Sequence, residues 1–518
     1  MLITTFGSAL QGINAVTISI EVNWLLTGKS TSIVGLPDSA VRESLERIES
    51  AYKTNGFRFP RTKLVINLAP ADQRKSGTAF DLPIALGILG ASGQLNNSRQ
   101  LSDYVIMGEL ALDGTIRPVK GALPIAIRAR QDNFKGLILP IENLQEASLV
   151  EGLAVWGARH LCDLVTFFSG QDHALSLGKN IKWQDCAELL QATHEDLNEV
   201  RGQEQAKRAL EIAAAGGHHM ILIGAPGSGK TLLAKRLPTI LPLMTPNEAL
   251  ETTQIYSAAG RLANKPSLLL SRPFRHPHHS ISDKGLIGGG SPPQAGEISL
   301  AHHGILFLDE LPEFNRNALE ALRQPLEERK IVIARMGHSY EYPASFMLVA
   351  AMNPCPCGYK DHPERECNCS PGAVQRYMNR ISGPLMDRID LQVAVRPVPV
   401  KKLTEPLTAP NSAAIRKKVE MARQVQLARL STQPGMFCNA QLSGSLLREH
   451  CSIDNPGKKL LERAMEKLRL SARAHDRLLK LARTIADLEG CSAIELQHLA
   501  EAIQYRSLDR QNPSGTAW

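Results

Sequence analysis

The sequence predicts an α/β protein with a parallel sheet at its centre, a mixed α+β domain before it and an all-helical domain after it. Three observations support this order. Residues 200–395 alternate helical segments with apolar strand-like runs, the pattern of a parallel sheet covered by helices. A glycine-rich loop lies between one such run and a helix, the context of a phosphate-binding loop. Residues after about 410 place apolar side chains on one helical face, as at Leu460, Leu461, Ala464 and Leu468.

The length and composition are those of a multidomain globular protein. The 518 residues suffice for about three domains. The chain is 43% hydrophobic and 21% charged with a mean hydropathy of −0.15, which excludes a disordered chain, a fibre and a small secreted scaffold. The formal net charge of +8 is compatible with an anionic partner such as nucleic acid, but does not by itself predict one.

The sequence shows no signal for export or membrane insertion. No Lys or Arg precedes Lys29, so the basic segment of a signal peptide is missing. The longest apolar stretch, 82–93, is shorter than the roughly 20 residues that span a bilayer, so we interpret it as a buried helix. Nine cysteines without an export signal favour a reducing compartment. We therefore expect a cytoplasmic protein without a membrane partner.

The first block, residues 1–170, mixes alternating strand patterns with helical ones. Its clearest elements are strands at 16–22 and 63–67 and helices at 39–52 and 81–89. The segment that follows, 171–199, is polar and has no clear period. We predict that it is a linker with one short helix at most.

The strongest local signal is a P-loop that follows the apolar run 220–223. Backbone N–H groups of such a loop surround phosphates, and the helix that begins near Lys230 adds the positive end of its dipole. Lys230 is expected to neutralise the β and γ phosphates, and the Thr231 hydroxyl to bind Mg²⁺. The predicted ATP-binding residues of this loop are Gly224, Ala225, Pro226, Gly227, Ser228, Gly229, Lys230, Thr231 and Leu232.

An acidic pair, Asp309 and Glu310, ends the apolar run 305–308. Asp309 is expected to bind ATP through the hydration shell of Mg²⁺, and Glu310 to polarise the attacking water as a general base. A strand followed by an acidic helix cap is the alternative interpretation.

Two further polar residues complete the predicted hydrolysis site. Asn353 follows the strand-like run 346–351, where it can orient the lytic water. Arg388 lies between two acids in 387–390 and is expected to act as a finger that completes a neighbouring subunit's site. A salt bridge on a helix surface is the alternative for Arg388.

Together, these residues resemble the AAA+ ATPases. The segments 272–280, 288–290, 293–314 and 501–510 narrow the resemblance to the ComM (YifB) family, which is described as magnesium chelatase-like. The resemblance covers nearly the whole chain. It implies an AAA+ core at 200–395, a helical lid at 396–518, and a homohexameric ring with ATP and Mg²⁺ at subunit interfaces. It also implies a sensor arginine in the lid, which falls on Arg473, with Arg477 and Arg483 nearby.

Two segments of the first block resemble Lon protease. Residues 74–83 are similar to the segment around Lon's serine, and 108–123 to the segment with its lysine. A Ser–Lys dyad needs a hydroxyl nucleophile and an amine base. This chain has Ala79 and Leu123 at those positions, and the nearest serine and lysine are each displaced by three residues. We therefore predict a Lon-like domain, 1–170, that is no peptidase and serves as a scaffold or a nucleic-acid-contacting collar.

Basic side chains gather on two predicted loops between the nucleotide motifs. The segment 272–282, with a glycine tip at 288–290, is similar to an inserted hairpin that projects toward the pore of a ring. Residues 330–340 read as a second hairpin. Basic and aromatic side chains on loops suit phosphate contacts and base stacking. The predicted DNA-contacting residues are Arg272, Arg275, Lys284, Arg335 and His338, with contacts between subunits as the alternative.

The family resemblance implies an ATP-driven DNA helicase that promotes branch migration when transforming single strands are incorporated. Its partners would be single-stranded and branched DNA, together with recombination proteins. One alternative is a chelatase subunit that couples ATP to Mg²⁺ insertion into a porphyrin, although we recognise no metal-ion-dependent adhesion motif in the chain. A protein-remodelling chaperone is the other alternative. Stimulation of the ATPase by single-stranded DNA would separate these functions.

Four of the nine cysteines lie within fifteen residues, as two Cys-x-Cys pairs on either side of a polar loop: Cys355, Cys357, Cys367 and Cys369. Four thiolates suit tetrahedral Zn²⁺ in a closed structural site, although the Cys-x-Cys spacing is tighter than usual. Disulfides are disfavoured in a reducing compartment. The alternatives are four buried free cysteines, and a zinc site in which His362 replaces one cysteine. A structural zinc here would hold the chain between Asn353 and Arg388.

Overall fold

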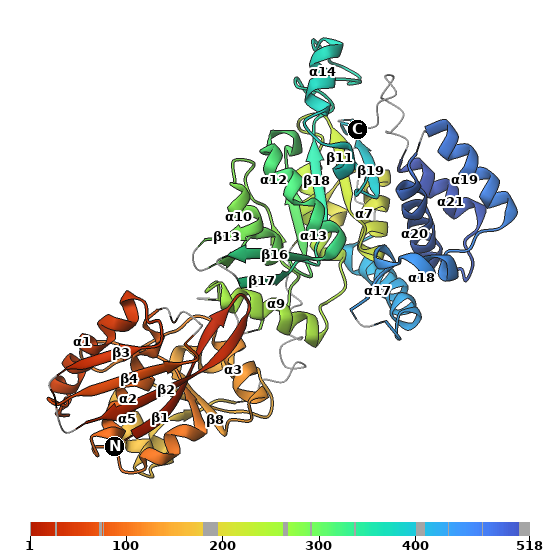
Figure 1. Cartoon of the computed structure of the whole chain (residues 1–518). Helices are drawn as coiled ribbons and strands as arrows, with labels where there is room; N and C mark the ends of the chain where they lie inside the picture. Colours follow the sequence, from red (N-terminus) through yellow and green to blue (C-terminus); the bar gives the residue numbers. More distant parts are fainter. Residues whose placement is uncertain are drawn as a thin grey trace. The chain divides into compact units, whose positions relative to one another are not determined.

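The computed structural model (Figure 1) describes residues 2–25, 28, 30–71, 75, 77–179, 195–262, 268–290, 293–335, 338–399, 410–433, 435–468 and 470–506. The chain forms two compact units, residues 1–189 with 246–270, and residues 190–245 with 271–518. Both units combine a sheet with helices, which confirms the predicted mixed α/β class. No helix among the described residues is both long and apolar enough to cross a bilayer.

The first unit contains an eight-stranded sheet in the order β10-β9-β8-β5-β1-β2-β4-β3. Its strands are β1 (Leu2–Gln11), β2 (Asn14–Trp24), β3 (Thr31–Val34), β4 (Leu64–Ala69), β5 (Tyr104–Ile106), β8 (Gly136–Pro140), β9 (Ala154–Ala158) and β10 (Ser176–Leu177). Its helices include α1 (Ser39–Thr54), α2 (Asp81–Ala91), α3 (Ala122–Gln131), α4 (Leu144–Ala147) and α5 (Leu161–Phe168), and a small ribbon joins β6 (Glu109–Leu110) to β7 (Ile116–Arg117).

Helix α2 is the centre of this unit, because every one of its residues is buried. It packs against β1 and β2 on one side and against α1 on another. Its first turn begins at the buried Asp81, whose carboxylate accepts two hydrogen bonds from Arg47, at 2.7 and 2.8 Å. The apolar run 82–93 is thus a buried helix, as predicted.

The predicted linker, 171–199, is folded at both of its described ends. Strand β10 pairs antiparallel with β9, so the sheet continues past residue 170. At the other end, the Asp196 carboxylate accepts the backbone N–H of Ser412 at 3.0 Å. Residues 180–194 lie outside the described part of the chain.

Helix α9 (Pro246–Ala258) corrects the predicted domain organisation. We expected residues 200–395 to form one core, but residues 246–270 belong to the first unit. The Gly121 N–H donates to the Ser257 carbonyl at 3.1 Å, and Leu250 packs against an apolar cluster that contains Leu123. The periodicity of 246–258 indicates a helix, but it does not specify which domain covers the apolar face of that helix.

The second unit contains a five-stranded sheet in the order β12-β15-β18-β11-β19, with every pair parallel. Its strands are β11 (Met220–Gly224), β12 (Phe274–Arg275), β15 (Ile305–Leu308), β18 (Met347–Met352) and β19 (Leu391–Val395). Strands β15 and β18 are buried along their whole length, as expected of a parallel sheet covered on both faces. Because β11 lies beside β18, the loops that follow these strands emerge at one edge of the sheet.

The helices of this core are short apart from the first. They are α7 (Glu204–Gly216), α8 (Lys230–Arg236), α10 (Asp283–Ile287), α11 (Glu297–Leu300), α12 (Arg316–Ala321), α13 (Arg323–Glu328), α14 (Pro371–Met378) and α15 (Gly383–Met386). Helix α8 begins directly after the glycine-rich loop, so its N-terminal N–H groups face the loop.

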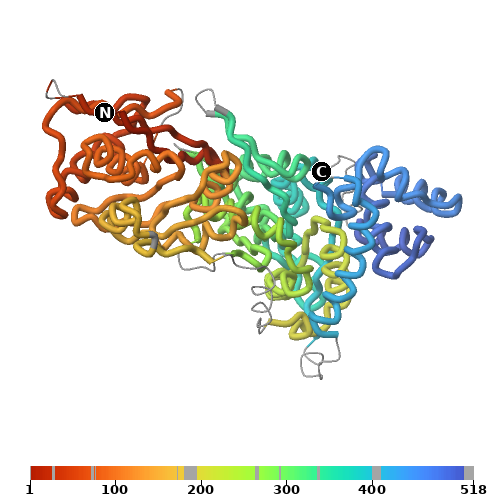
Figure 2. Tube along the Cα trace, turned by 90° about the horizontal axis from the view of Figure 1, so that it is seen from below, coloured from red at the N-terminus to blue at the C-terminus, as the bar shows by residue number. Residues whose placement is uncertain are grey.

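The all-helical domain predicted at the C-terminal end is confirmed, and it appears as the blue helices of Figure 2. Its helices are α17 (Ser412–Arg429), α18 (Gly444–His450), α19 (Asn455–Leu468), α20 (Ala472–Leu488) and α21 (Leu496–Gln504). The buried Asp487 carboxylate accepts hydrogen bonds from Arg429, Asn439 and Arg483. These bonds tie α17, α20 and the loop before α18 together.

Two hairpins lie side by side in the second unit. Strands β16 (Lys330–Arg335) and β17 (His338–Pro343) form the hairpin predicted at 330–340. Strand β13 (Gly288–Gly289) pairs with β14 (Gln294–Ala295), so these glycines form a strand rather than the predicted tip. The Tyr342 hydroxyl donates to the Pro293 carbonyl at 2.9 Å, and a Cβ on Gly288 would lie 3.1 Å from Ile333 Cδ1.

Candidate nucleotide site and cysteine cluster

Lys230 lies inside the P-loop and joins it to the end of β18. Its ammonium group donates to the carbonyls of Gly224 and Ala225, at 2.7 and 3.0 Å, and to Asn353 Oδ1 at 3.2 Å. Burial lowers the pKa of Lys230, while Asp309 and Glu310 oppose this shift. The structure thus brings the predicted phosphate-binding lysine next to the predicted sensor asparagine.

The rest of the loop has the backbone shape that its glycines allow. Gly227 and Gly229 have φ values of +77° and +94°, a region that favours glycine. Gly224 packs so closely on β19 that a Cβ there would lie 2.2 Å from the Val395 carbonyl oxygen. Ser228 is buried, whereas Pro226 and Leu232 are exposed at the mouth of the site.

The acidic pair lies beside the start of α8. The Thr231 hydroxyl donates to Asp309 Oδ2 at 2.7 Å, so two oxygen ligands of the kind that Mg²⁺ prefers are adjacent. Glu310 has a φ of +53°, which is unfavourable for a residue other than glycine. Its side chain is 57% exposed, and one carboxylate oxygen lies 3.2 Å from His279 Nδ1.

Sequence reasoning missed His279 and Gln203 as members of this site. Gln203 Nε2 donates to the Ser228 carbonyl at 3.2 Å and to the Arg396 carbonyl at 2.6 Å, so it links the P-loop to the chain after β19. No local pattern marks Gln203. His279 could have been found from topology, because β12 runs parallel to β15 and the chain after it emerges near Glu310.

Arg272 and Arg275, two of the predicted DNA-contacting residues, have partners within the second unit. The Arg275 guanidinium forms a two-pronged ion pair with Glu297, at 2.6 and 2.8 Å. The Arg272 guanidinium donates to three backbone carbonyls, those of Pro242, Leu243 and His303. Both arginines therefore hold the core together. Sequence alone could not separate a basic loop from two arginines with partners in other segments.

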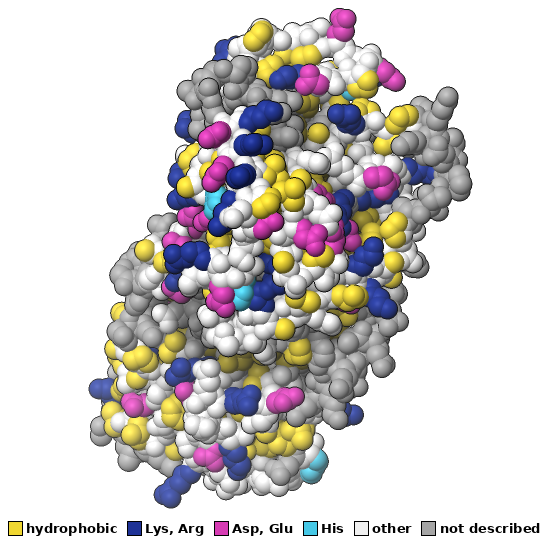
Figure 3. Space-filling model, turned by 90° about the vertical axis from the view of Figure 1, so that its right-hand side faces the viewer, with side chains coloured by type: hydrophobic (Ala, Val, Ile, Leu, Met, Phe, Trp, Pro, Cys, Tyr) yellow, Lys and Arg dark blue, Asp and Glu magenta, His cyan; other side chains and the backbone are white. Residues whose placement is uncertain are grey.

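The remaining predicted DNA residues lie on the two hairpins or beside them. Lys284 is exposed on α10, and a Cβ on Gly289 would lie 3.6 Å from its Cγ. Arg335 and His338 face each other across the end of the β16–β17 ribbon, and their side chains lie outside the described part of the structure. On the face drawn in Figure 3, lysine and arginine side chains are interspersed with acidic ones among the residues described.

Arg388 and Arg473 share one carboxylate, that of Glu327. The Arg388 guanidinium lies 2.5 Å from Glu327, donates to the Pro384 carbonyl at 2.6 Å, and is only 6% exposed. Arg473, at the start of α20, lies 4.0 Å from the same carboxylate and is 62% exposed. In this conformation Arg388 is paired within its own protomer, so a role in a neighbouring site requires it to leave Glu327.

The other two arginines of α20 have buried partners. Arg477 lies 2.9 Å from Asp390, and Arg483 lies 3.0 Å from Asp487. Among these three arginines of α20, Arg473 is therefore the one with an exposed guanidinium.

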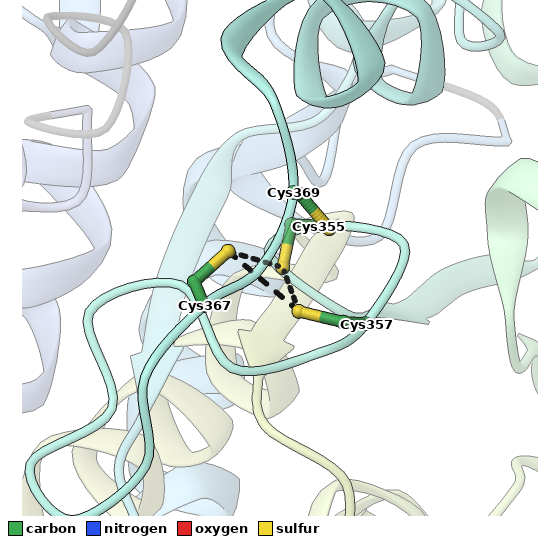
Figure 4. A group of neighbouring side chains, drawn as sticks. All are labelled: Cys355, Cys357, Cys367 and Cys369. Atoms are coloured by element: carbon green, nitrogen blue, oxygen red, sulfur yellow. Dashed lines mark hydrogen bonds between the residues drawn. The ribbon is translucent and has the colours of Figure 1, made fainter.

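The four clustered cysteines converge after Asn353 (Figure 4). The sulfur atoms of Cys355, Cys357 and Cys367 are 3.3 to 3.6 Å apart, and the cluster including Cys369 fits within 4.8 Å. The four thiols are free, and the sulfurs are too far apart for a disulfide. The backbone N–H of Tyr359 lowers the pKa of the Cys357 thiol to about 6.

The cysteine loop packs directly on the P-loop. Gly358 has a φ of +84°, and a Cβ on it would lie 2.5 Å from Pro226 Cδ and 3.8 Å from Asn353 Cγ. The Gly358 N–H donates to the Cys355 carbonyl at 3.0 Å, so the turn that brings the cysteines together also sets this contact. Gly358, within the cysteine loop, therefore places the cysteine cluster directly beside the P-loop.

Three family models match the chain. The model described as magnesium chelatase, subunit ChlI, matches residues 196–403, and its C-terminal counterpart matches residues 409–506. A third, described as subunit ChlI of Mg-chelatase, matches residues 20–143 in the first unit.

Relatives match nearly the whole chain. The competence protein ComM of Haemophilus influenzae is 43% identical over 507 residues, which cover 98% of this chain and 97% of that protein. The protein YifB of Escherichia coli is 42% identical over 508 residues, which cover 97% of this chain and 96% of that protein. The magnesium-chelatase 67 kDa subunit of Chlorobaculum parvum is 28% identical over 160 residues, only 30% of this chain and 23% of that protein.

The contact between Gly358 and Pro226 predicts that a methyl group at residue 358 disturbs nucleotide binding. Gly358→Ala is strained by its positive φ and by the overlap with the proline ring, so we expect about tenfold weaker binding of a fluorescent ADP analogue. Gly372→Ala is the matched control, because a Cβ there meets nothing within 4 Å. Equal affinities of the two variants would show that this contact does not support the P-loop.

Proposed function

Because this chain belongs to the ComM (YifB) family of magnesium chelatase-like AAA+ proteins, we propose that it is an ATP-driven DNA helicase that promotes branch migration. It acts as a homohexamer on single-stranded and branched DNA during recombination of transforming DNA. The observation that carries the proposal is the 43% identity to a competence protein across 98% of the chain, combined with the contacts of Lys230 with Asn353 and of Thr231 with Asp309.

The contacts of the site assign a task to each residue. Lys230 is desolvated and held by backbone carbonyls, so its ammonium is positioned to exchange these partners for phosphate oxygens. Thr231 and Asp309 would hold Mg²⁺, which neutralises charge on the β and γ phosphates. Asn353 orients the attacking water, and Glu310 accepts its proton.

The strain at Glu310 serves this last step. A left-handed backbone turns the carboxylate out of the strand direction and places it beside His279, where solvent reaches it. The short contact between these two side chains holds the carboxylate at the mouth of the site. A base with an exposed, oriented carboxylate is what activation of a water molecule requires.

The two adjacent hairpins are the proposed DNA-contacting surface. They come from different insertions, but Tyr342 and Ile333 join them into one element. Of the predicted DNA-contacting residues, Lys284, Arg335 and His338 lie on these hairpins or beside them, whereas Arg272 and Arg275 have partners within the second unit. Basic side chains on such ribbons would contact phosphates without reading sequence.

The second candidate function is that of a magnesium chelatase subunit. The descriptions of the family models favour this function. The magnesium-chelatase 67 kDa subunit of Chlorobaculum parvum, however, is similar to only 30% of the chain. A protein-remodelling chaperone has no specific observation in its favour.

A three-strand branch-migration assay tests the proposed function. Purified protein with ATP should move the branch, and the Lys230→Ala variant should not, because it lacks the ammonium that binds phosphate. Single-stranded DNA should also stimulate ATP turnover. A protein that binds DNA but moves no branch under any ionic condition is not a helicase, and an ATPase indifferent to DNA would favour the chelatase function.

Exchange of one carboxylate for an amide should separate ATP binding from hydrolysis. We expect Glu310→Gln to bind ATP but lose nearly all turnover, because the amide cannot accept the proton of the attacking water. The measurements are nucleotide titration and steady-state phosphate release. Retained turnover would assign the general base to another residue.

Mixed rings test whether Arg388 acts on a neighbouring subunit. Arg388→Ala should also abolish turnover in a uniform ring, since each site then lacks its finger. When Arg388→Ala and Glu310→Gln chains are mixed, some interfaces regain both groups and activity should partly return. If mixed rings assemble and remain inactive, Arg388 acts only within its own protomer, as its pairing with Glu327 would then indicate.

The β16–β17 hairpin should contribute to DNA affinity. We expect Arg335→Ala to weaken binding and to reduce the slope of log K against log salt by about one unit or less, because one phosphate contact is lost. ATP turnover without DNA should not change. Arg448→Ala, which removes an exposed arginine from lid helix α18, is the control. An identical salt slope for the two variants would exclude this hairpin from the DNA interface.

We also propose that the cysteine cluster holds a structural Zn²⁺. In a tetrahedral site with Zn–S bonds of 2.3 Å, the sulfurs lie about 3.8 Å apart. The observed separations of 3.3 to 3.6 Å are close to this value, and they need only a small expansion. The Lys360 N–H points to Cys355 Sγ at 3.3 Å, a bond that stabilises a thiolate. His362 Nδ1 accepts the N–H groups of Glu364 and Arg365, which favours four cysteines over a site with histidine.

Metal analysis tests the zinc site. Protein purified without a histidine tag should contain about one zinc per chain, and the double variant Cys367→Ser, Cys369→Ser should lose it. Cys491→Ser, which alters a cysteine outside the cluster, should retain the metal. A metal-free wild-type protein that assembles and hydrolyses ATP normally would rule out the structural zinc.

A further inference from the structure

We propose that the Lon-like domain is an anchor for α9, and that Arg272 connects this anchored helix to the nucleotide site. On this proposal, ATP binding at the P-loop changes the N terminus of α3 in the first unit. The proposal rests on the proposed binding of ATP, but it is independent of any action on DNA.

Helix α3 is capped by residues outside the helix. The residue before this helix, Gly121, has a φ of +76° and provides no side-chain cap. The first N–H groups of a helix lack partners within the helix and need them from elsewhere. Gly121 N–H donates to the Ser257 carbonyl of α9 at 3.1 Å, and Leu123 N–H donates to Glu146 at 3.1 Å. The Ser257 hydroxyl donates to the same Glu146 oxygen, so α9 accepts the N–H of the residue before α3 and also holds the carboxylate that caps the helix.

Helix α9 packs beside the two positions at which the resemblance to Lon would place a catalytic dyad, Ala79 and Leu123. Leu123, at the position of Lon's lysine, is fully buried in an apolar cluster. Ala79, at the position of Lon's serine, packs against this cluster, and so does Leu250 of α9. An ammonium or a hydroxyl without a partner would be costly in such a cluster. Leu123 and Ala79 thus belong to an apolar surface against which α9 packs through Leu250.

Further contacts hold α9 along its length. Gln254 Nε2 donates to the Ile13 carbonyl at 3.0 Å and to Asn14 Oδ1 at 3.2 Å, at the turn between β1 and β2. Just beyond the helix, a Cβ on Gly260 would lie 2.8 Å from Lys120 Cδ. Helix α9 is therefore an integral part of the first unit, although residues 190–245 before it and 271–518 after the excursion belong to the second.

The α9 excursion is closed at its base. Arg272, where the chain returns, donates to the carbonyls of Pro242 at 2.7 Å and Leu243 at 3.3 Å, where the chain leaves. The same guanidinium donates to the His303 carbonyl at 2.8 Å, two residues before β15. The Arg272 side chain thus joins three segments. They are the chain that leads to α9, the chain that returns from it, and the chain just before β15, the strand that the acidic pair follows.

The segments that Arg272 joins continue into the two elements that flank the nucleotide site, α8 and β15. The exit segment continues α8 and the short helix at 237–240, and α8 carries Thr231. The strand β15 ends next to Asp309, the partner of Thr231. If ATP binding changes the separation of α8 and β15, it therefore also shifts the segments that Arg272 holds together, 242–243 and His303. Through these segments the change reaches α9.

Hydrogen exchange measured by mass spectrometry on the full chain tests the proposal. In the Glu310→Gln background, where bound ATP persists, ATP should change the exchange rate of amides 121–125 by at least about threefold. Addition of Arg272→Gln should abolish this response, while ATP still protects amides 227–232 of the P-loop. Arg448→Gln, which alters an exposed lid arginine, should leave both responses intact.

Two further variants and one control keep the test decisive. Arg272→Lys retains a positive charge but fewer donors, so it should give an intermediate response if Arg272→Gln fails to fold. Leu250→Ser should speed exchange at 121–125 without nucleotide, whereas Leu427→Ser on the exposed face of α17 should not.

Each outcome has a distinct meaning. If ATP protects the P-loop but amides 121–125 do not respond, the proposal is overturned. It is also overturned if Arg272→Gln keeps the response. If ATP fails to protect the P-loop itself, the proposed nucleotide site is wrong, and the coupling falls with it.

Discussion

The pairing of β11 with β18 and of β18 with β15 is the constraint on which the chemistry of this protein depends. Because these strands are parallel, their carboxyl ends meet at one edge of the sheet, and each delivers a polar group there. Strand β11 leads to Lys230, β18 to Asn353 and β15 to the acidic pair. The register of the ladders, set by buried apolar side chains, brings Lys230 Nζ within 3.2 Å of Asn353 and Thr231 within 2.7 Å of Asp309. A slip of one residue would turn these groups to the other face.

The cysteine loop and Gln203 contact the P-loop at the same edge of the sheet. The cysteine loop follows Asn353 immediately and rests on Pro226 through Gly358, so a metal held by its thiolates would stiffen the P-loop from outside. Gln203 holds the loop from the other side, through the carbonyls of Ser228 and Arg396. The nucleotide site is thus supported by three segments that are distant in sequence. This explains why a single methyl group at residue 358 is expected to matter.

The first unit illustrates how the side chains of a surface decide what that surface can bind. A dyad needs a polar, accessible site, whereas Ala79 and Leu123 favour burial. Helix α9 packs against the apolar cluster that contains Leu123, and it contacts both Gly121 and the Glu146 carboxylate at the N terminus of α3. Arg272, which looked like a DNA contact because it lies in a basic segment, instead closes the excursion that carries this helix. In the coupling that we propose, this closure would link the first unit to the two sides of the nucleotide site.

The sequence by itself determined the features that depend on local pattern. The glycines of the P-loop, the apolar runs of β11, β15 and β18 and the amphipathic lid helices each have a spacing that indicates one kind of local structure. The spacing of the paired cysteines left both a zinc site and free thiols open. Tertiary structure alone decided what depends on partners from distant segments. It placed α9 in the first unit, paired Arg275 with Glu297, buried Arg388 against Glu327, and brought Gln203 and His279 to the nucleotide site. The physical reason is that a charged or polar side chain takes the partner that folding brings within about 3 Å, and no periodicity records that partner.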